Sequence, residues 1–521
     1  MNVWQRAAGD GQRAASGRRH RAVAAETAWG WQQKAADCRQ AGSGQRAAGS
    51  GQRAAGSGQR AAGSGQRAAG EASFVGSDGN GGYVGLMGSA IDTQVAAVNE
   101  LTARWAALSG DRDFVVSGAG VWPLLALLAA AADGPARAEL EAAVGLPAER
   151  AQGAALEVLR IMAEAEELSA ALGAWFAEGF PLHRAWTDSL PPDIIGRLTG
   201  QEALDSWAAR GTGGLIDRFP LRIEPDTMLV LATALVAKTE WCEHFADAVL
   251  RPETGPWRGI VGRGLTRTTG DLSQVSLLDG PDLVTRVVVT GTGDLDVHLL
   301  LGAESNGGES PDTGLPGIVH GTKPNDSGSP DTMLGAAPGS TEPPRTSSPG
   351  AVLTTGLAAL TGDVPVRNHL PPGTTGPGLR VTQHRAPRPG DRLDIRLPPF
   401  EIRSSHDLCA TPELFGLTAA MRTDRNHFPA ISPEPLALAH GVQDVLARFT
   451  REGFEAAAVT SFAAVAVSMP LSAEHLITQV EVAFDRPFGF LAVHRATGLA
   501  VVAGWVAELP ARIHAPGDLH D

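Results

Sequence analysis

The chain has few of the residues that build metal centres or membrane spans. Its three cysteines, Cys38, Cys242 and Cys409, are far apart and form no CxxC pair, so the sequence supports no zinc site. The longest apolar run, residues 121–132, is too short to cross a bilayer, and no membrane partner is expected. No apolar signal-peptide core stands near the N-terminus, so the sequence alone predicts a cytoplasmic location.

The motifs of several enzyme classes are also lacking. The chain contains no GxSxG elbow, no HExxH, no GxxxxGK[ST] and no GxGxxG that opens a helix. Its 14 histidines are scattered, and for His406, beside Asp407, and for His440 a solvated loop position is the favoured interpretation. The sequence therefore predicts no catalytic residues, no cofactor and no metal, and the protein is not expected to be an enzyme.

Lysine is scarce, and charge is distributed unevenly along the chain. The net charge is −14, but residues 1–70 hold eleven basic and three acidic residues, so the rest of the chain carries −22. A globular part this acidic repels phosphate backbones, and no nucleic-acid partner is expected.

Low-complexity sequence occurs in two places. Residues 42–69 are four copies of GSGQRAA, which bury no apolar face, so residues 1–86 are predicted to be a disordered basic tail. We interpret Met87 as the natural start, the alternative being a basic tether. A region rich in Pro and Gly at about 303–378 is predicted to be a loop insertion in which residues 351–360 form one short helix. Residues 511–521 are expected to be a C-terminal tail.

Between these regions the periodicity predicts both helices and strands. Apolar residues at helical spacing predict a helix over 91–108, and further helices are expected over 121–132 and 136–144, where Gly145 is the stop. A short strand is predicted at 114–117, and the apolar run 227–237 is typical of a strand buried on both faces. Residues 488–494 and 499–506 predict a hairpin with its turn at 495–498.

In the stretch REGFEAAAVTSFAAVAVSMP, residues 451–470, a glycine and a glutamate lead into an uncharged run dominated by Ala, Val, Thr and Ser, close to the C-terminus. Its composition is compatible with a buried alanine-rich helix, which intrinsic propensity favours, with a core strand or with a mobile loop. Composition alone leaves these three alternatives open.

Four motifs resemble segments of the serpin family and occur in the same order. The chain resembles a bacterial-type member of that family. The motifs are DFVVSGAGVWPLLALLAAAADGPARAELEAAVGL, LVLATALVAKTEWCEHF, LPPFEI…LFGLTAAM…HFPAIS and FDRPFGFLAVHRATGLAVVAGWV, and they cover about residues 90–510. The resemblance implies one domain over 87–510 with an α+β fold: a large mixed sheet, smaller antiparallel sheets, about eight or nine helices and an exposed reactive loop.

The resemblance also implies site residues and a mechanism. Ser117 and Thr233 match the family's shutter positions, and Trp241 and Gln443 its sheet opening. The loop hinge is matched by Gly453, Phe454, Glu455, Ala456, Ala457, Ala458 and Thr460. In the family a serine-type endopeptidase cuts the loop, the loop inserts into the main sheet as a new strand, and the protease is trapped covalently.

Departures from the family's pattern keep an alternative open. Arg451 replaces a glutamate whose ion pair holds the top of the sheet, and Phe454 replaces a small residue at the first position to be buried. Gln443 replaces a buried histidine, and Gly120 replaces a second shutter serine. The alternative is a non-inhibitory serpin that acts as a binding or storage module.

The reactive bond is predicted by counting along the loop. Counting forward from Gly453 gives Val467–Ser468, whereas counting backward from Pro487 ends near Leu476. We favour the forward count, because the hinge determines which residues insert. A small apolar residue before the cut fits an elastase-like serine protease. The protein is expected to be a monomer, and an extracellular location follows if the family's usual compartment holds.

Overall fold

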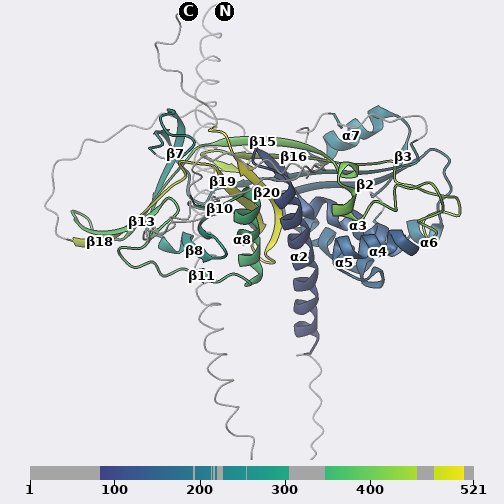
Figure 1. The fold of residues 1–521 in the computed structure, drawn as a ribbon, viewed down its shortest axis with the longest axis horizontal. Coiled ribbons are helices and arrows are strands. Elements are labelled where there is room, and N and C mark those ends of the chain that lie inside the picture. The colour runs from purple at the N-terminus through teal and green to yellow at the C-terminus, as the bar shows by residue number, and fades with distance from the viewer. Residues whose placement is uncertain are drawn as a thin grey trace, which may run out of the picture.

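The computed structural model describes residues 82–191, 194–212, 214, 218–219, 227–253, 255–303, 347–454 and 475–509. These residues form eight α-helices and three β-sheets, which confirms the predicted α+β class (Figure 1). In this part of the chain no helix is long and apolar enough to cross a membrane.

The main sheet has the strand order β3-β2-β4-β16, with β15 on the free side of β16 and the short strands β17 and β5 at one end. Its strands are β2 (Leu168–Ala177), β3 (Ile195–Leu198), β4 (Leu229–Ala237), β5 (Thr239–Glu240), β15 (Phe400–Asp407), β16 (His440–Phe449) and β17 (Gly453–Phe454). Only two of its pairings are parallel: β2 with β3, and β4 with β16.

A second sheet, the core sheet, has the order β1-β20-β19-β10-β9-β8-β11. Its strands are β1 (Phe114–Val116), β8 (Val275–Asp279), β9 (Leu283–Thr290), β10 (Leu295–Leu301), β11 (Val366–Arg367), β19 (Phe488–His494) and β20 (Leu499–Val506). Every residue of β10, β19 and β20 is buried, so these apolar strands form the centre of the molecule. The predicted C-terminal hairpin is confirmed.

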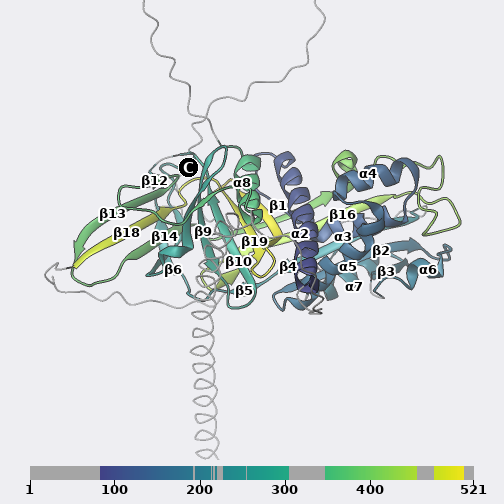
Figure 2. The same ribbon diagram turned by 90° about the horizontal axis from the view of Figure 1, so that it is seen from below.

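A third sheet, the outer sheet, has the order β12-β13-β18-β14-β7-β6. Its strands are β6 (Ala246–Leu250), β7 (Gly262–Thr269), β12 (Thr375–Gly376), β13 (Leu379–Ala386), β14 (Arg392–Leu397) and β18 (His475–Ala483). β13 and β18 form a ribbon that projects from the body of the molecule (Figures 1 and 2).

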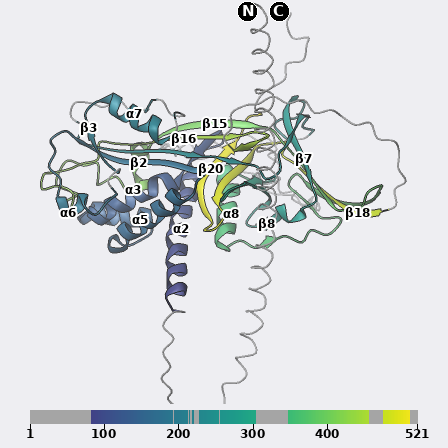
Figure 3. The same cartoon turned by 180° about the vertical axis from the view of Figure 1, so that it is seen from behind.

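The helices cover the sheets. They are α2 (Gly82–Leu108), α3 (Gly118–Ala131), α4 (Gly134–Val144), α5 (Ala148–Glu164), α6 (Arg184–Thr187), α7 (Gln201–Gly211), α8 (Pro349–Thr361) and α9 (Pro412–Phe415). Helices α3 to α6 lie on one side of the main sheet and α7 on the other, as the view from behind also shows (Figure 3). α4 ends at Gly145 with a left-handed backbone (φ 69°), as predicted.

Both faces of the main sheet are therefore buried where α7 covers it. Residues alternate along β4, so that Leu229, Leu231 and Leu235 join the large core, while Val230 and Ala232 pack with α7. This explains why residues 227–237 read as one continuous apolar run.

The short helix predicted over 351–360 is confirmed as α8, whereas a loop insertion that extends to about 378 does not fit the packing of this helix. Residues 304–346 lie outside the described residues, but α8 follows and is part of the packed fold. Ser348 caps α8 by accepting a hydrogen bond from the Ala351 amide, and Val352, Leu353 and Leu357 are buried. α8 lies beside α2 (Figure 1), and its composition concealed this because small residues fill the close contact. The predicted disordered tail lies outside the described residues up to residue 81, as does the predicted C-terminal tail; residues 82–86 begin α2.

Candidate functional site at the opening of the main sheet

At one end of the main sheet, the two-residue strand β17 lies between β16 and β5. We call this end, where the strands on either side of β17 no longer pair directly, the opening. Below it, β4 and β16 pair in parallel, with Thr233 opposite Gln443. Above, β17 lies between β16 and β5 and is antiparallel to both. Phe454 pairs with Phe449 on one side and with Thr239 on the other. The chain that leaves β16 thus reverses and enters between the two strands that flank the opening.

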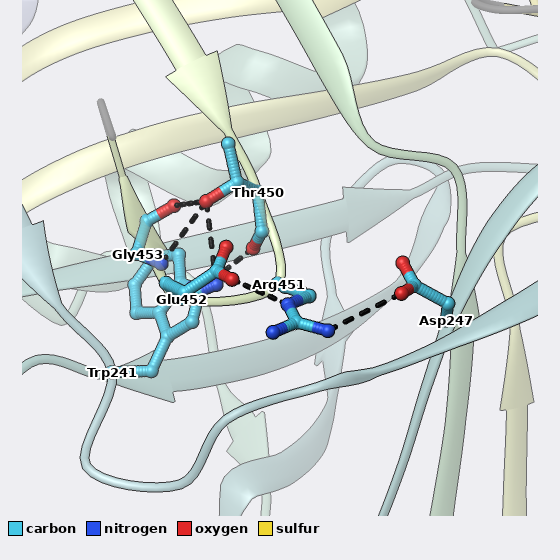
Figure 4. Close-up of polar contacts among 6 residues, drawn as sticks. All are labelled: Trp241, Asp247, Thr450, Arg451, Glu452 and Gly453. Atoms are coloured by element: carbon cyan, nitrogen blue, oxygen red, sulfur yellow. Dashed lines mark hydrogen bonds and ion pairs between the residues drawn. The ribbon is translucent and has the colours of Figure 1, made fainter. Parts of the chain in front are cut away.

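A tight turn over Thr450 to Gly453 produces this reversal (Figure 4). The Thr450 amide donates to the Gly453 carbonyl (2.9 Å), and its Oγ1 donates to the same oxygen (3.1 Å). The same Oγ1 accepts from the amides of Glu452 (3.3 Å) and Gly453 (3.2 Å). A threonine at the start of such a turn is a sequence signal that could have located it.

Trp241, directly after β5, ties this turn to the sheet. Its backbone amide donates to the Glu452 carbonyl (2.9 Å), and its indole Nε1 donates to the Thr450 carbonyl (3.0 Å; Figure 4). Its ring lies 4.7 Å from that of Phe449, and only 1% of its surface is exposed. Trp241 thus lies at the sheet opening, where the resemblance placed it.

A glycine is required at position 453 because the backbone of β5 lies very close to it. A Cβ at this position would lie 2.3 Å from the Thr239 carbonyl oxygen, far inside van der Waals contact. Any larger residue would push β17 away from β5, so the glycine permits the strand to enter the opening.

Phe454 is already buried, which corrects the expected cost of its ring. The resemblance implied that Phe454 is buried only on insertion, at the expense of packed neighbours. The side chain is 0% exposed, and its ring lies 6.2 Å from that of Phe490 in the core sheet. The ring therefore does not have to enter the core during insertion, because the turn seats it there beforehand.

Arg451 replaces the expected glutamate without leaving this end of the sheet unpaired. Its Nη1 lies 3.3 Å from Asp247 Oδ2 on β6, and its Nε pairs with Glu452 (Figure 4). The Glu452 carboxylate, and secondarily Asp247, raises the pKa of Arg451 above its ordinary value. Ion pairs are therefore present at this end of the sheet, with the positive charge on the residue that follows Thr450.

A second group of site residues lies deeper in the sheet. Gln443 Oε1 accepts from the Ser117 amide (3.0 Å), while its Nε2 donates to the Ser117 carbonyl (2.8 Å) and to Thr233 Oγ1 (3.3 Å). Ser117 also donates to the Val501 carbonyl (2.6 Å) of the core sheet. We call Ser117, Thr233 and Gln443 the buried polar trio; each is at most 1% exposed.

Gly120 provides the room that the Gln443 side chain occupies. A Cβ at Gly120 would lie 2.9 Å from Gln443 Nε2 and 3.3 Å from Ser117 Oγ. The two departures from the family's pattern at these positions therefore compensate each other: the longer amide fills the space that a second serine would take.

The two residues predicted at the sheet opening, Trp241 and Gln443, lie in different parts of the sheet. Trp241 contacts the turn, whereas Gln443 belongs with Ser117 and Thr233, six positions further down β16 than Phe449. The predicted hinge residues Glu455, Ala456, Ala457, Ala458 and Thr460, and the reactive bond Val467–Ser468, lie outside the described residues. Sequence reasoning missed Asp247, Thr450 and Phe490, because their roles arise from contacts between distant segments.

The two histidines singled out in the sequence are not loop residues. His406 is half-buried on β15, where its Nε2 lies 2.7 Å from the Val115 carbonyl and burial lowers its pKa. His440 begins β16. In the described part of the chain no group of three or more His, Cys, Asp or Glu side chains could hold a metal ion. At the opening, the described contacts are the pairings of β17 with β16 and with β5.

Comparison with known proteins agrees with this arrangement. Residues 374–509 match the family described as serpin (serine protease inhibitor), a range that includes β14 to β20 and therefore the turn and β17. This is the serpin fold. Among curated proteins, a sequence comparison finds no match.

Solved structures share the serpin fold over most of the chain. The native state of tengpin, a thermophilic serpin, is 15% identical and covers 84% of this chain and 96% of its own, with a TM-score of 0.54. Native protease nexin-1 with heparin is 14% identical and covers 81% and 99%, with a TM-score of 0.54. Human thyroxine-binding globulin complexed with its ligand is also 14% identical and covers 81% and 98%, again with a TM-score of 0.54.

Proposed function

We propose that the protein is a serpin that inhibits serine-type endopeptidases by loop cleavage, insertion of the loop into the main sheet and covalent trapping of the protease. The observation that carries the proposal is the position of β17, which already pairs with both strands that flank the opening. A chain that continues β17 between β4 and β16 would be antiparallel to both. It would gain backbone hydrogen bonds on two sides, which gives insertion a driving force.

The buried position of the Phe454 side chain removes one argument against inhibition. The described residues already hold its ring in the core, so the first step of insertion needs no new cavity. The protein supplies no catalytic group in this mechanism; the protease provides its own nucleophile.

The structure also bears on which bond is cut. The backward count ends near Leu476, but Leu476 and Ile477 lie in β18, where they pair with Arg385 and His384 of β13. A protease binds its substrate as an accessible extended chain, and a paired strand whose Ile477 is 1% exposed is a poor substrate. This supports Val467–Ser468, with an elastase-like serine protease as the partner. The monomeric state and the bacterial type of member remain parts of the proposal.

A direct test is to incubate the protein with elastase-, trypsin- and chymotrypsin-like serine proteases and to look for a complex that survives SDS. The expected result is a complex with an elastase-like protease and a released C-terminal fragment that begins at Ser468. Cleavage that yields no complex and no rise in thermal midpoint would contradict inhibition.

A second candidate function, ligand binding, has one observation in its favour. A pocket of about 730 Å³ lies between β6, β12, β13, β14 and β18, and Arg251, Arg380 and Arg396 line it. The serpin fold of thyroxine-binding globulin is known in complex with thyroxine, so the fold can serve as a binding module. Glu253, Glu481 and Asp485 also line the pocket, so charges of both signs face it. Failure of the protease assay would leave this function standing.

A further inference from the structure

A second pocket, which we call the ribbon pocket, lies between β18 of the outer sheet and β8 of the core sheet. Its volume is about 440 Å³. Besides these two strands, it is lined by the short 3-10 helix Leu272–Gln274, by residues 368–372 after β11 and by Asp391 before β14. A pocket of this size is within the range that binds small organic molecules.

Most of the wall of the ribbon pocket is apolar. Val275 of β8 and Val480 of β18 line it from the two sheets, and each is only 1% exposed. The other apolar lining residues are Leu272, Leu370, Pro371 and Pro372. Such a wall favours a ligand with an apolar body, because their contact removes apolar surface from water.

Hydrogen bonds hold the wall at Pro371 in place. The amide and the Oγ1 of Thr374 both donate to the Pro371 carbonyl, at 3.0 and 2.7 Å. The Gly373 amide donates to the Val381 carbonyl of β13 (2.9 Å), which ties this segment to the ribbon. Each proline ring also restricts its own backbone φ. The pocket is therefore largely formed before a ligand arrives, which lowers the entropic cost of binding.

Asp391 gives the ribbon pocket a negative charge. Among the described residues that line it, Asp391 is the only carboxylate, and none is Lys or Arg. Arg367 and Arg392 each follow or precede a lining residue in the chain, but neither lines the pocket. The Arg367 guanidinium is instead bound to Asp279 through two contacts of 2.7 Å. The charge of this pocket thus has one sign, unlike that of the 730 Å³ pocket.

The Asp391 carboxylate is oriented by one of its oxygens and open at the other. Oδ1 accepts from the Thr478 backbone amide (2.7 Å), whereas Oδ2 makes no hydrogen bond within the described part of the chain. The other polar side chains that line the pocket are Ser273, Asn368, His369 and Thr478. A ligand can therefore donate to Oδ2 without breaking the bond that orients the carboxylate.

We propose that the ribbon pocket binds a small organic cation, in which an ammonium group is attached to an apolar body. The ammonium group pairs with Asp391 Oδ2, and the apolar body packs against the valines and prolines of the wall. This inference goes beyond the proposed function and does not depend on it, because no lining residue belongs to the turn, to β17 or to the buried polar trio.

The test is isothermal titration calorimetry of the full chain with three indole compounds. Tryptamine, tryptophol and indole-3-propionate carry an ammonium, a hydroxyl and a carboxylate on the same ring system. Tryptamine should bind about fivefold more tightly than tryptophol, the usual size for an ion pair that water can reach. Indole-3-propionate should bind more weakly than tryptophol, because its charge repels Asp391.

Two isosteric substitutions locate the charge that selects the ligand. Asp391→Asn keeps an oxygen that can accept from the Thr478 amide, so it should only remove the difference in affinity between tryptamine and tryptophol. Asp394→Asn is the matched control, because Asp394 lies on β14 outside the pocket, and it should keep that difference. Leu370→Ala, which removes an apolar part of the wall, should weaken tryptamine and tryptophol alike. Thermal midpoints without ligand check that each variant is folded.

Several results would overturn the inference. They are the absence of tryptamine binding at millimolar concentration, equal affinity for tryptamine and tryptophol in the natural sequence, and the same loss of selectivity with Asp391→Asn and Asp394→Asn. Unchanged affinities in Leu370→Ala would place the ligand elsewhere and would also overturn it. No protease enters this experiment, so its outcome is separate from that of the trapping assay.

Discussion

Trp241 is the residue through which the opening can be tested most directly. It holds the turn through two hydrogen bonds and fills the space beside Phe449. Trp241→Ala should lower the free energy of unfolding by about 3–5 kcal/mol, as is usual for truncation of a large buried aromatic side chain. Urea denaturation provides the measurement.

Trp241→Phe separates the two contributions of this side chain. It keeps most of the ring packing but removes the indole donor to the Thr450 carbonyl, so about 1–3 kcal/mol should be lost. An alanine variant as stable as the natural protein would contradict the site as described, because the turn would then not depend on the tryptophan.

His298 gives the unfolding free energy a pH dependence. Burial on β10, and secondarily the charge of Arg286, lowers the pKa of His298 to about 3. Between about pH 6.5 and pH 3 the unfolded chain binds a proton at this position that the folded protein does not bind. The contribution of His298 to stability is therefore lost as the pH falls through that window, with a slope of up to about 1.4 kcal/mol per pH unit.

The measurement is urea denaturation at several pH values between 4 and 7. His298→Leu should show a shallower loss of stability on acidification than the natural protein. His384→Leu, which removes an exposed imidazole, supplies the control variant. Parallel curves for the natural protein and His298→Leu would show that the ring is not held neutral.

At the scale of elements, local sequence patterns predicted those helices and strands whose formation depends on residues close together in the chain. The hairpin of β19 and β20, the helices α3 and α4 and the buried strand β4 all follow from periodicity and from stop signals such as Gly145. α8 was predicted only as a short helix in an insertion, because the Pro- and Gly-rich sequence around it concealed that it packs into the fold.

β17 and the buried polar trio could not be predicted in the same way. Gln443 and Ser117 are 326 residues apart, and their contact depends on how the main sheet lies against the start of α3. The family resemblance indicated that both residues matter but placed Gln443 beside Trp241. Only the register of β16 against β4 shows that Gln443 is instead the neighbour of Thr233.

β18 is the element that follows the proposed loop, and it is held on both sides. β13 pairs with it over residues 475–482, and β14 over residues 479–483. Ile477, Val480 and Val482 are each 1% exposed. A strand with a neighbour on each side can leave its sheet only if the hydrogen bonds to both neighbours break. The chain after the loop is therefore held in the outer sheet.

Hydrogen exchange measured by mass spectrometry can test this attachment within one strand. Amides of residues 479–482, which have neighbours on both sides, should exchange much more slowly than those of 475–478, which pair with β13 alone. The first half of β18 thus serves as the internal control. Equally fast exchange in both halves would contradict the described pairing.

At the scale of the whole molecule, the four motifs of the sequence resemblance come together around the main and core sheets. β1 and α3 come from the first motif, β4 to Trp241 from the second, β15 from the third, and β19 and β20 from the last. The hydrogen bonds of Ser117 to Val501 and to Gln443 join the first motif to the last motif and to β16. Sequence reasoning could therefore name the fold, whereas β12 and β13, which no motif covers, emerged only from the structure.

The remaining prediction concerns how much of the chain the fold needs. Val95 and Val98 of α2 pack into the core, at 4% and 0% exposure. A chain that begins at Met87 keeps both and removes the repeats, so its urea midpoint should equal that of the full chain. A chain that begins at Leu101 loses both valines and should be destabilised by about 3–6 kcal/mol, because each buries a side chain worth about 1.5–3 kcal/mol when fully removed from water. A clear loss of stability in the Met87 chain would mean that residues before it pack onto the fold, and the interpretation of Met87 as the natural start would have to be abandoned.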